Sequence, residues 1–158
     1  MRCHLEHVVQ AWSPWLAKDI ELMENVQKRA VRCIQGLSGS YAEKLKQIGL
    51  TTLKERRERG DMIQTFKIVH GIDDVEPGTW FSFLSDVQQR PTRSAVQIGE
   101  DGASSSKLTL KAEKCNLDVR KHFFSNRVIG KWNVLPESLK SAVSVDAFKH
   151  GYDELFGM

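Results

Sequence analysis

Apolar residues recur every three or four positions along most of this chain, which is the spacing of one face of an α-helix. That spacing predicts helices over residues 2–12, 18–37, 40–48, 52–70, 118–135 and 144–155. Apolar and polar residues alternate only around Leu108–Leu110, which favours a short two-stranded piece there. The expected fold is therefore mainly α, an irregular helical bundle with one long loop.

Two of the predicted helices begin with a capping box. Ser40 is followed by Glu43, and Thr52 is followed by Glu55. In each pair the hydroxyl can accept a backbone N–H of the first turn, and the carboxylate can return the bond. Gly49 and Gly71 come directly after the last apolar positions, so both are expected to end their helices.

Each long helix has one apolar face that predicts a core contact. The predicted core positions are Leu22, Val26, Ala30 and Cys33; Met62, Phe66 and Val69; Phe124, Val128, Trp132 and Leu135; and Val145, Phe148, Tyr152 and Leu155.

A chain of 158 residues fits one helical domain, residues 1–158. Residues 85–106 show no periodicity and contain Pro91, Gly99 and Gly102, so they are predicted to form a loop. This loop divides the domain into predicted lobes of residues 1–84 and 107–158.

Composition describes an ordinary globular protein, with 41% hydrophobic and 27% charged residues. No apolar run approaches the roughly 20 residues that cross a bilayer, so no membrane contact is expected and an intracellular protein of the cytoplasm or nucleus is predicted. A net charge of only +3 means that any nucleic-acid contact must depend on local clusters of cations.

The cysteines and histidines give little reason to expect a metal or cofactor. The three cysteines are odd in number and far apart, which argues against a disulfide framework or a zinc ribbon. Cys3, His4 and His7 lie close together, but no fourth ligand follows at suitable spacing. Satisfied or exposed side chains are the favoured interpretation, and no cofactor is predicted.

The start of the 52–70 helix is dense in cations. Arg56 and Arg59 lie on one side of it, where they could contact a phosphate backbone. The competing interpretation is a solvated, salt-bridged helix start, because Glu55 lies four residues before Arg59 and such a pair contributes roughly 0.2–0.5 kcal/mol. The sequence leaves both interpretations open.

A second cluster of cations is predicted beside the apolar stripe of the 118–135 helix. Arg120, Arg127 and Lys131 recur there at helical spacing, with Phe123 at the border. Such a row can follow a phosphate backbone, while Phe123 or Trp80 offers a ring for base stacking. Solvation of a core helix would place cations in the same way, so the two interpretations stand side by side.

No set of residues predicts catalysis. Asp73 and Asp74 could hold metal ions only if a rigid turn and a third carboxylate supported them, but they follow a helix end and precede Pro77. A solvated loop is the favoured interpretation. No Ser or Cys lies in a GxSxG-type turn, so the chain is predicted not to be an enzyme.

Four parts of the chain carry a family resemblance: residues 5–37; YAEKLKQIGLTTLKERRERGDMIQTFKIVHGIDDV at 41–75; the pair Thr92-Arg93; and VRKHFFSNRVIGKWNVLPESLKSAVSVDAFKH at 119–150. In this order they resemble the C-terminal region of reverse transcriptases encoded by jockey-like non-LTR retrotransposons, a group of long interspersed elements (LINEs). The resemblance implies thumb-like helices and an extension that help to hold template RNA and primer DNA. It also implies that the catalytic aspartates lie upstream, and that Asp73 and Asp74 match a non-catalytic loop.

Two functions follow as hypotheses. The first is a non-catalytic fragment of an RNA-directed DNA polymerase that binds RNA or an RNA–DNA hybrid. The second is a helical protein-interaction module, whose apolar face near Leu5, Val8 and Trp12 would bind the missing polymerase. Met1 falls inside a segment that is continuous in the family it resembles, so the reading frame is expected to begin partway through an element. A relic without a selected function is the third interpretation.

Overall fold

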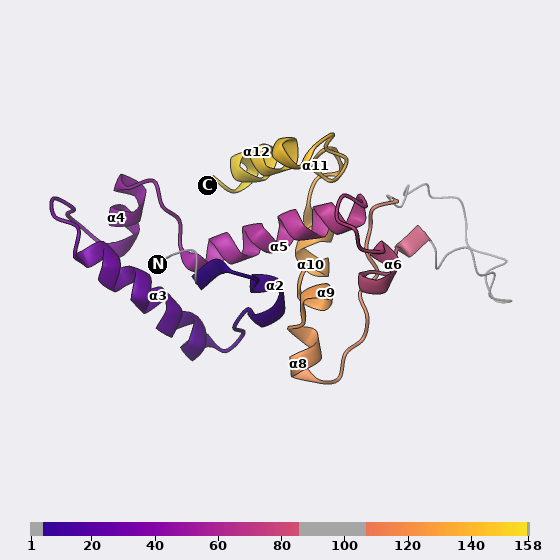
Figure 1. The fold of residues 1–158 in the computed structure, drawn as a ribbon, viewed down its shortest axis with the longest axis horizontal. Coiled ribbons are helices and arrows are strands. Elements are labelled where there is room, and N and C mark those ends of the chain that lie inside the picture. Colours follow the sequence, from indigo (N-terminus) through magenta and orange to yellow (C-terminus); the bar gives the residue numbers. More distant parts are fainter. Residues whose placement is uncertain (1–4, 86–106, 158) are drawn as a thin grey trace, which may run out of the picture. The chain divides into compact units, whose positions relative to one another are not determined.

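The computed structural model describes residues 5–85 and 107–157, and it is mainly helical (Figure 1). Its helices are α2 (Val9–Trp12), α3 (Ala17–Arg32), α4 (Tyr41–Gln47), α5 (Leu53–Val69), α6 (Pro77–Trp80), α8 (Asp118–Lys121), α9 (Phe124–Arg127), α10 (Ile129–Val134), α11 (Glu137–Lys140) and α12 (Val145–Phe156). The predicted fold class, a mainly α irregular helical bundle, is confirmed. None of these helices has both the length and the apolar character that crossing a bilayer requires.

The chain divides into two compact units. Unit 1 comprises Met1–Asp61 with Phe156–Met158, and unit 2 comprises Met62–Leu155. The division falls within α5, whereas the sequence suggested lobes on either side of the loop 85–106. Residues 86–106 of that loop lie outside the described residues, so the two-lobe arrangement stays a prediction.

A chain of hydrogen bonds around Gln27 holds unit 1 together. The side-chain Nε2 of Gln27 donates to the Tyr41 hydroxyl (3.0 Å) and to the Thr51 carbonyl (3.1 Å). The Tyr41 hydroxyl donates to Glu24, whose other oxygen accepts the backbone N–H of Leu53 (3.1 Å). These bonds join the middle of α3 to the first residues of α4 and α5.

Both predicted capping boxes form. In α4 the Ser40 N–H donates to Glu43 Oε2 (2.6 Å) and the Glu43 N–H donates back to the Ser40 hydroxyl (3.4 Å). In α5 the equivalent distances between Thr52 and Glu55 are 2.9 and 3.2 Å. The two donors of Ser40 hold the pKa of the Glu43 carboxyl below its ordinary value, because they stabilise the charged form.

Gly49 and Gly71 end α4 and α5 as predicted, each in the left-handed conformation with φ of 62°. After α5 the N–H of Gly71 donates to Ile68 O (3.1 Å) and the next N–H, from Ile72, donates to Lys67 O (2.9 Å). This pair of bonds is the Schellman pattern, and it favours glycine at the left-handed position.

The predicted core face of α3 is wrong. Leu22 is 64% exposed, and Val26, Ala30 and Cys33 are exposed as well. The helix instead buries an adjoining face that contains Gln27 and Val31. The hydrogen bonds of Gln27 explain the rotation, because they require its amide to lie inside unit 1. The helix also ends at Arg32, before the predicted end at Leu37.

The predicted helix over residues 2–12 is interrupted. Val8 has φ of 50°, a left-handed conformation that is unfavourable for a β-branched residue, and α2 begins only at Val9. Val9 is buried and Val8 is exposed, so Val9 is the valine of this stretch that contributes to the core. Residues 2–4 lie outside the described residues.

Unit 2 has an aromatic core that the sequence predicted well. Phe124, Val128, Trp132 and Leu135 are all buried, as are Met62 and Phe66 of α5 and Phe148 and Tyr152 of α12. The rings of Phe66 and Phe148 stack with centroids 4.5 Å apart, and Phe148 lies 6.1 Å from Trp132. At the end of the α12 stripe, however, Leu155 is exposed.

Asn133 joins α10 to the extended segment around Leu110. Its Oδ1 accepts the Leu110 N–H (3.0 Å) and its Nδ2 donates to the Leu110 carbonyl (2.8 Å), so one side-chain amide pairs with both backbone groups of Leu110. The same segment forms a single antiparallel bridge between Phe83 and Leu110. Trp132 Nε1 also donates to the Leu108 carbonyl (2.8 Å). The short two-stranded piece predicted near Leu108–Leu110 is therefore present as this one bridge.

We predict that Asn133→Asp destabilises the protein by about 2 kcal/mol, because a carboxylate can accept the Leu110 N–H but cannot donate to the buried Leu110 carbonyl. The free energy of unfolding in urea measures this change. Val134→Ala, at an exposed neighbouring position, is the control and should stay within about 0.5 kcal/mol of the parent. Equal stability of the two variants would show that the amide does not hold the segment.

Candidate nucleic-acid interface

The structure divides the predicted nucleic-acid-binding residues between the two units. Unit 1 contains Arg56 and Arg59, and unit 2 contains Arg120, Phe123, Arg127 and Lys131. The four residues of unit 2 lie on or between α8, α9 and α10, which follow one another end to end in Figure 1. We refer to residues 107–135, which contain these helices, as the basic segment.

The arginines of unit 1 are engaged within the protein. The Nε and Nη2 atoms of Arg56 donate to the two carboxylate oxygens of Glu6, at 2.6 and 2.8 Å. Arg59 is half-buried and also has an interaction partner. Their neighbour Arg57 is 4% exposed, and burial lowers the pKa of its guanidinium, which nearby carboxylates such as Glu24 counteract. This geometry favours the salt-bridged interpretation of the α5 start.

The predicted helix over 118–135 is interrupted by one extended residue. Phe123 has φ of −63° and ψ of 148°, so α8 ends before it and α9 begins after it. Val128, between α9 and α10, keeps helical angles, and the N–H of Trp132 donates to its carbonyl (2.9 Å). Arg127 and Lys131 therefore remain one turn apart on nearly continuous helix, while Arg120 belongs to a separate turn. The prediction that Arg120, Arg127 and Lys131 form a single row on one helix is therefore wrong.

The interruption at Phe123 separates two adjacent aromatic side chains. Phe124 is buried, whereas Phe123 is 50% exposed. The Phe123 ring lies nearly parallel to Trp80 of α6, with an interplanar angle of 4° and centroids 6.3 Å apart. Trp80 also contacts the buried Phe124 ring edge-on, with centroids 6.0 Å apart. Trp80 therefore lies between Phe123 and the core. Phe123 thus presents part of its surface to solvent while Trp80 holds its ring.

Side chains of α9 satisfy the backbone where α8 stops. Asn126 Nδ2 donates to the carbonyl of Arg120 (2.8 Å), and Arg127 Nη1 donates to the carbonyl of His122 (3.2 Å). The Arg127 guanidinium also lies over the Phe124 ring, 5.6 Å from its centroid. Arg127 is therefore partly structural, because the same side chain stabilises the interruption and carries charge to the surface.

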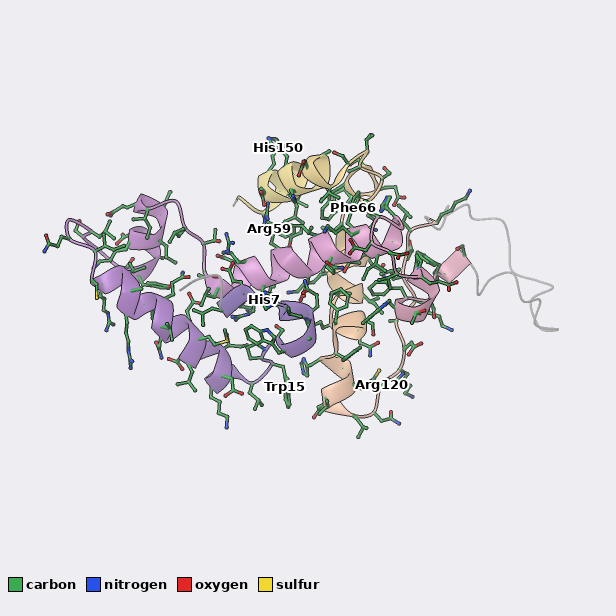
Figure 2. The ribbon with its side chains drawn as sticks, in the orientation of Figure 1. His7, Trp15, Arg59, Phe66, Arg120 and His150 are labelled. Atoms are coloured by element: carbon green, nitrogen blue, oxygen red, sulfur yellow. The ribbon has the colours of Figure 1, made fainter. Side chains whose placement is uncertain are left out.

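Arg120 and Lys131 are exposed cations of the basic segment. Figure 2 shows Arg120 at the α8 end of the three-helix run, away from the core residue Phe66. Its Nη2 lies 3.3 Å from Glu113 Oε2, and both side chains are more than half exposed. Exposed pairs of this kind contribute about 0–1 kcal/mol, so a phosphate could replace the carboxylate at little cost.

Sequence reasoning missed four further cations of the basic segment. They are Lys107, Lys111, Lys114 and Lys121, and all are exposed. The segment contains seven lysines and arginines against Glu113 and Asp118, a net charge of +5, although the whole chain has only +3. The net charge of this stretch is the signal that identifies them, because Lys107, Lys111 and Lys114 lie outside the helices and helical spacing does not select them.

Asp73 and His70 both make contacts at the end of α5. Asp73 accepts from Gln64 Nε2 (2.6 Å) and lies 3.8 Å from Lys67 Nζ, so it closes the turn after α5. His70 Nδ1 lies 3.0 Å from the Phe66 carbonyl at the same helix end. Within residues 5–85 and 107–157, no three His, Cys, Asp or Glu side chains gather as metal ligands would. Cys3 and His4 lie outside those ranges, as does Thr92-Arg93.

Comparisons with known proteins add no family or neighbour: no family model, no curated protein and no solved structure matches this chain.

Proposed function

We propose that the protein binds single-stranded RNA, or the single-stranded part of a primed template, through the basic segment of unit 2. The observation that carries the proposal is the exposed Phe123 ring, held parallel to Trp80 inside a stretch with a net charge of +5. Cations that follow a phosphate backbone, together with an aromatic ring for a base, are the elements of sequence-tolerant binding to single strands.

Each element has a defined part in this proposal. Arg120 and Lys131 contact phosphates, because both are exposed and the Arg120–Glu113 pair is weakly held. Phe123 stacks on an unpaired base with the face that Trp80 leaves open. Arg127 contributes charge and keeps the interruption in place through its bond to the His122 carbonyl. Arg56, bound to Glu6, is left out of the proposed surface.

The sequence resemblance implies a biological role for such a surface. In a reverse transcriptase of the non-LTR kind, helices after the palm would hold template RNA and primer DNA. We therefore propose a non-catalytic role. The chain helps to bind nucleic acid, and other parts of the element carry out polymerisation.

Replacing Arg120, Arg127 and Lys131 together by Ala should weaken binding to a labelled single-stranded RNA at least tenfold. It should also lower the slope of log affinity against log salt by about 2, since each phosphate contact on a single strand contributes about 0.7. Fluorescence anisotropy across a salt series measures both quantities.

The matched control is Lys18, Arg29 and Arg32 changed together to Ala, three exposed cations of α3 in unit 1. This control removes the same charge and should keep the parent slope. If both triple variants lose affinity equally, binding depends on net charge alone. If neither does, the basic segment is only a solvated face.

Phe123→Ala should weaken binding to single-stranded RNA about 5- to 150-fold, because stacking on one base contributes roughly 1–3 kcal/mol. The salt dependence should not change, since no charge is removed. Phe123→Trp is the control and should keep the affinity. An unchanged affinity in Phe123→Ala would remove base stacking from the proposal, and circular dichroism would check that the helices of both variants are intact.

A second function is favoured by the apolar side chains exposed in unit 1. The predicted partner-binding residues Val8 and Trp12 are exposed and Leu5 is half-buried. Further exposed apolar side chains of the same unit are Trp15, Leu16, Leu22, Val26 and Ile34. Scattered apolar residues are ordinary on a surface, but one helix with an uncovered stripe is typical of a protein-binding face.

If this second function holds, Leu22→Glu should reduce self-association measured by sedimentation velocity, because a charge on the uncovered stripe opposes apolar contact. Val143→Glu, at a fully exposed position of unit 2, is the matched control and should leave self-association unchanged. A parent protein that is monomeric at all concentrations would count against the idea that this face binds another copy.

A further inference from the structure

The exposed face of α3 in unit 1 carries two opposite charges in line with its uncovered apolar residues. Leu22 is 64% exposed and Val26 is 36% exposed. Asp19 lies three residues before Leu22, and Arg29 lies three residues after Val26. At 3.6 residues per turn, these four side chains fall within about 80° around the helix axis. They lie on the side of α3 away from the buried Gln27 and therefore form one surface stripe.

The two charges of this stripe are not used within unit 1. Neither Asp19 nor Arg29 forms an ion pair inside residues 5–85 and 107–157. The helix dipole favours an acid near the start of a helix and a base near its end, which accounts for the order of the two charges along α3. The dipole does not account for their alignment with the exposed Leu22 and Val26. That alignment instead makes the stripe complementary to a partner with the reverse order of charges.

A second copy of α3 in the antiparallel direction presents this reverse order. Because the spacing from Asp19 to Leu22 equals the spacing from Val26 to Arg29, one register aligns all four positions. In that register Leu22 of each copy lies opposite Val26 of the other, and Asp19 of each copy lies opposite Arg29 of the other. A parallel pair would place each charge opposite a like charge, which opposes association. The charges therefore favour a single orientation.

We propose that the stripe of α3 binds the same stripe on a second copy of this chain, antiparallel and related by a two-fold axis. The proposal rests on the second proposed function, in which this face binds a protein, and it adds the identity and orientation of the partner. A self-complementary patch is what a closed two-fold dimer requires. One helix face offers less area than the roughly 800 Å² per partner of a stable complex, so the dimer should be weak and concentration-dependent.

Exchanging the two charges tests the arrangement, with sedimentation velocity of the full chain across a concentration series as the measurement. Asp19→Arg and Arg29→Asp should each weaken self-association roughly tenfold or more, because the two-fold axis turns one substitution into two like-charge contacts. The double variant, with both substitutions, restores opposite charges across an antiparallel pair. Its dissociation constant should return to within about threefold of the parent value, since exposed ion pairs differ little in strength. In a parallel pair the double variant would still oppose like charges.

The matched controls are Asp74→Arg and Lys54→Asp, which make the same charge changes at exposed positions outside α3 and should leave self-association unchanged. Circular dichroism checks that every variant is folded. If Leu22→Glu abolishes association but the double variant does not restore it, the antiparallel arrangement is overturned while the protein-binding face stands. If the parent is monomeric at all concentrations, the second copy is overturned as the partner. If the parent associates and Leu22→Glu does not weaken it, both the arrangement and the binding face are overturned.

Discussion

The extended backbone at Phe123 is the constraint on which the candidate interface depends. In a continuous helix the side chains of Phe123 and Phe124 would point about 100° apart around the helix axis, and both would lie at the edge of the core. The single extended residue instead buries Phe124 and presents Phe123 beside Trp80. Asn126 and Arg127 donate to the carbonyls of Arg120 and His122, and these bonds stabilise the end of α8. The same residues therefore stabilise the interruption and shape the surface.

Unit 1 shows a comparable choice between two requirements. The apolar stripe of α3 favours burying Leu22 and Val26, whereas the amide of Gln27 can satisfy its donors only inside the unit. The polar network prevails, because the half-buried Tyr41, Glu24 and Thr51 groups all depend on the same contacts. One consequence is that the apolar stripe of α3 stays uncovered.

The arginines illustrate how strongly position decides a role. Arg56 makes two bonds with Glu6, Arg57 is buried among carboxylates, and Arg120 forms only an exposed single contact. A guanidinium held in two bonds is a poor partner for a passing phosphate, whereas an exposed single pair exchanges readily. Composition treats these residues as equal, although only the last is available for the proposed contact.

Local chemistry could be predicted from the sequence by itself. The capping boxes at Ser40 and Thr52, the glycines that end α4 and α5, and the buried stripe from Phe124 to Leu135 depend on residues close together in the chain, whose interactions follow from helix geometry. The cations of the basic segment were also partly identified, since Arg120, Arg127 and Lys131 can be recognised from spacing.

Only the tertiary structure decided which of several locally acceptable arrangements was used. The exposed face of α3, the interruption at Phe123 and the pairing of Arg56 with Glu6 all depend on partners that are distant in sequence or on competition for burial. Periodicity ranks faces by apolarity, but it carries no information about which amide or carboxylate will need a partner. That is the physical reason why the helices and several cations of unit 2 were foreseen, while the exposed face of α3 and the interruption at Phe123 were not.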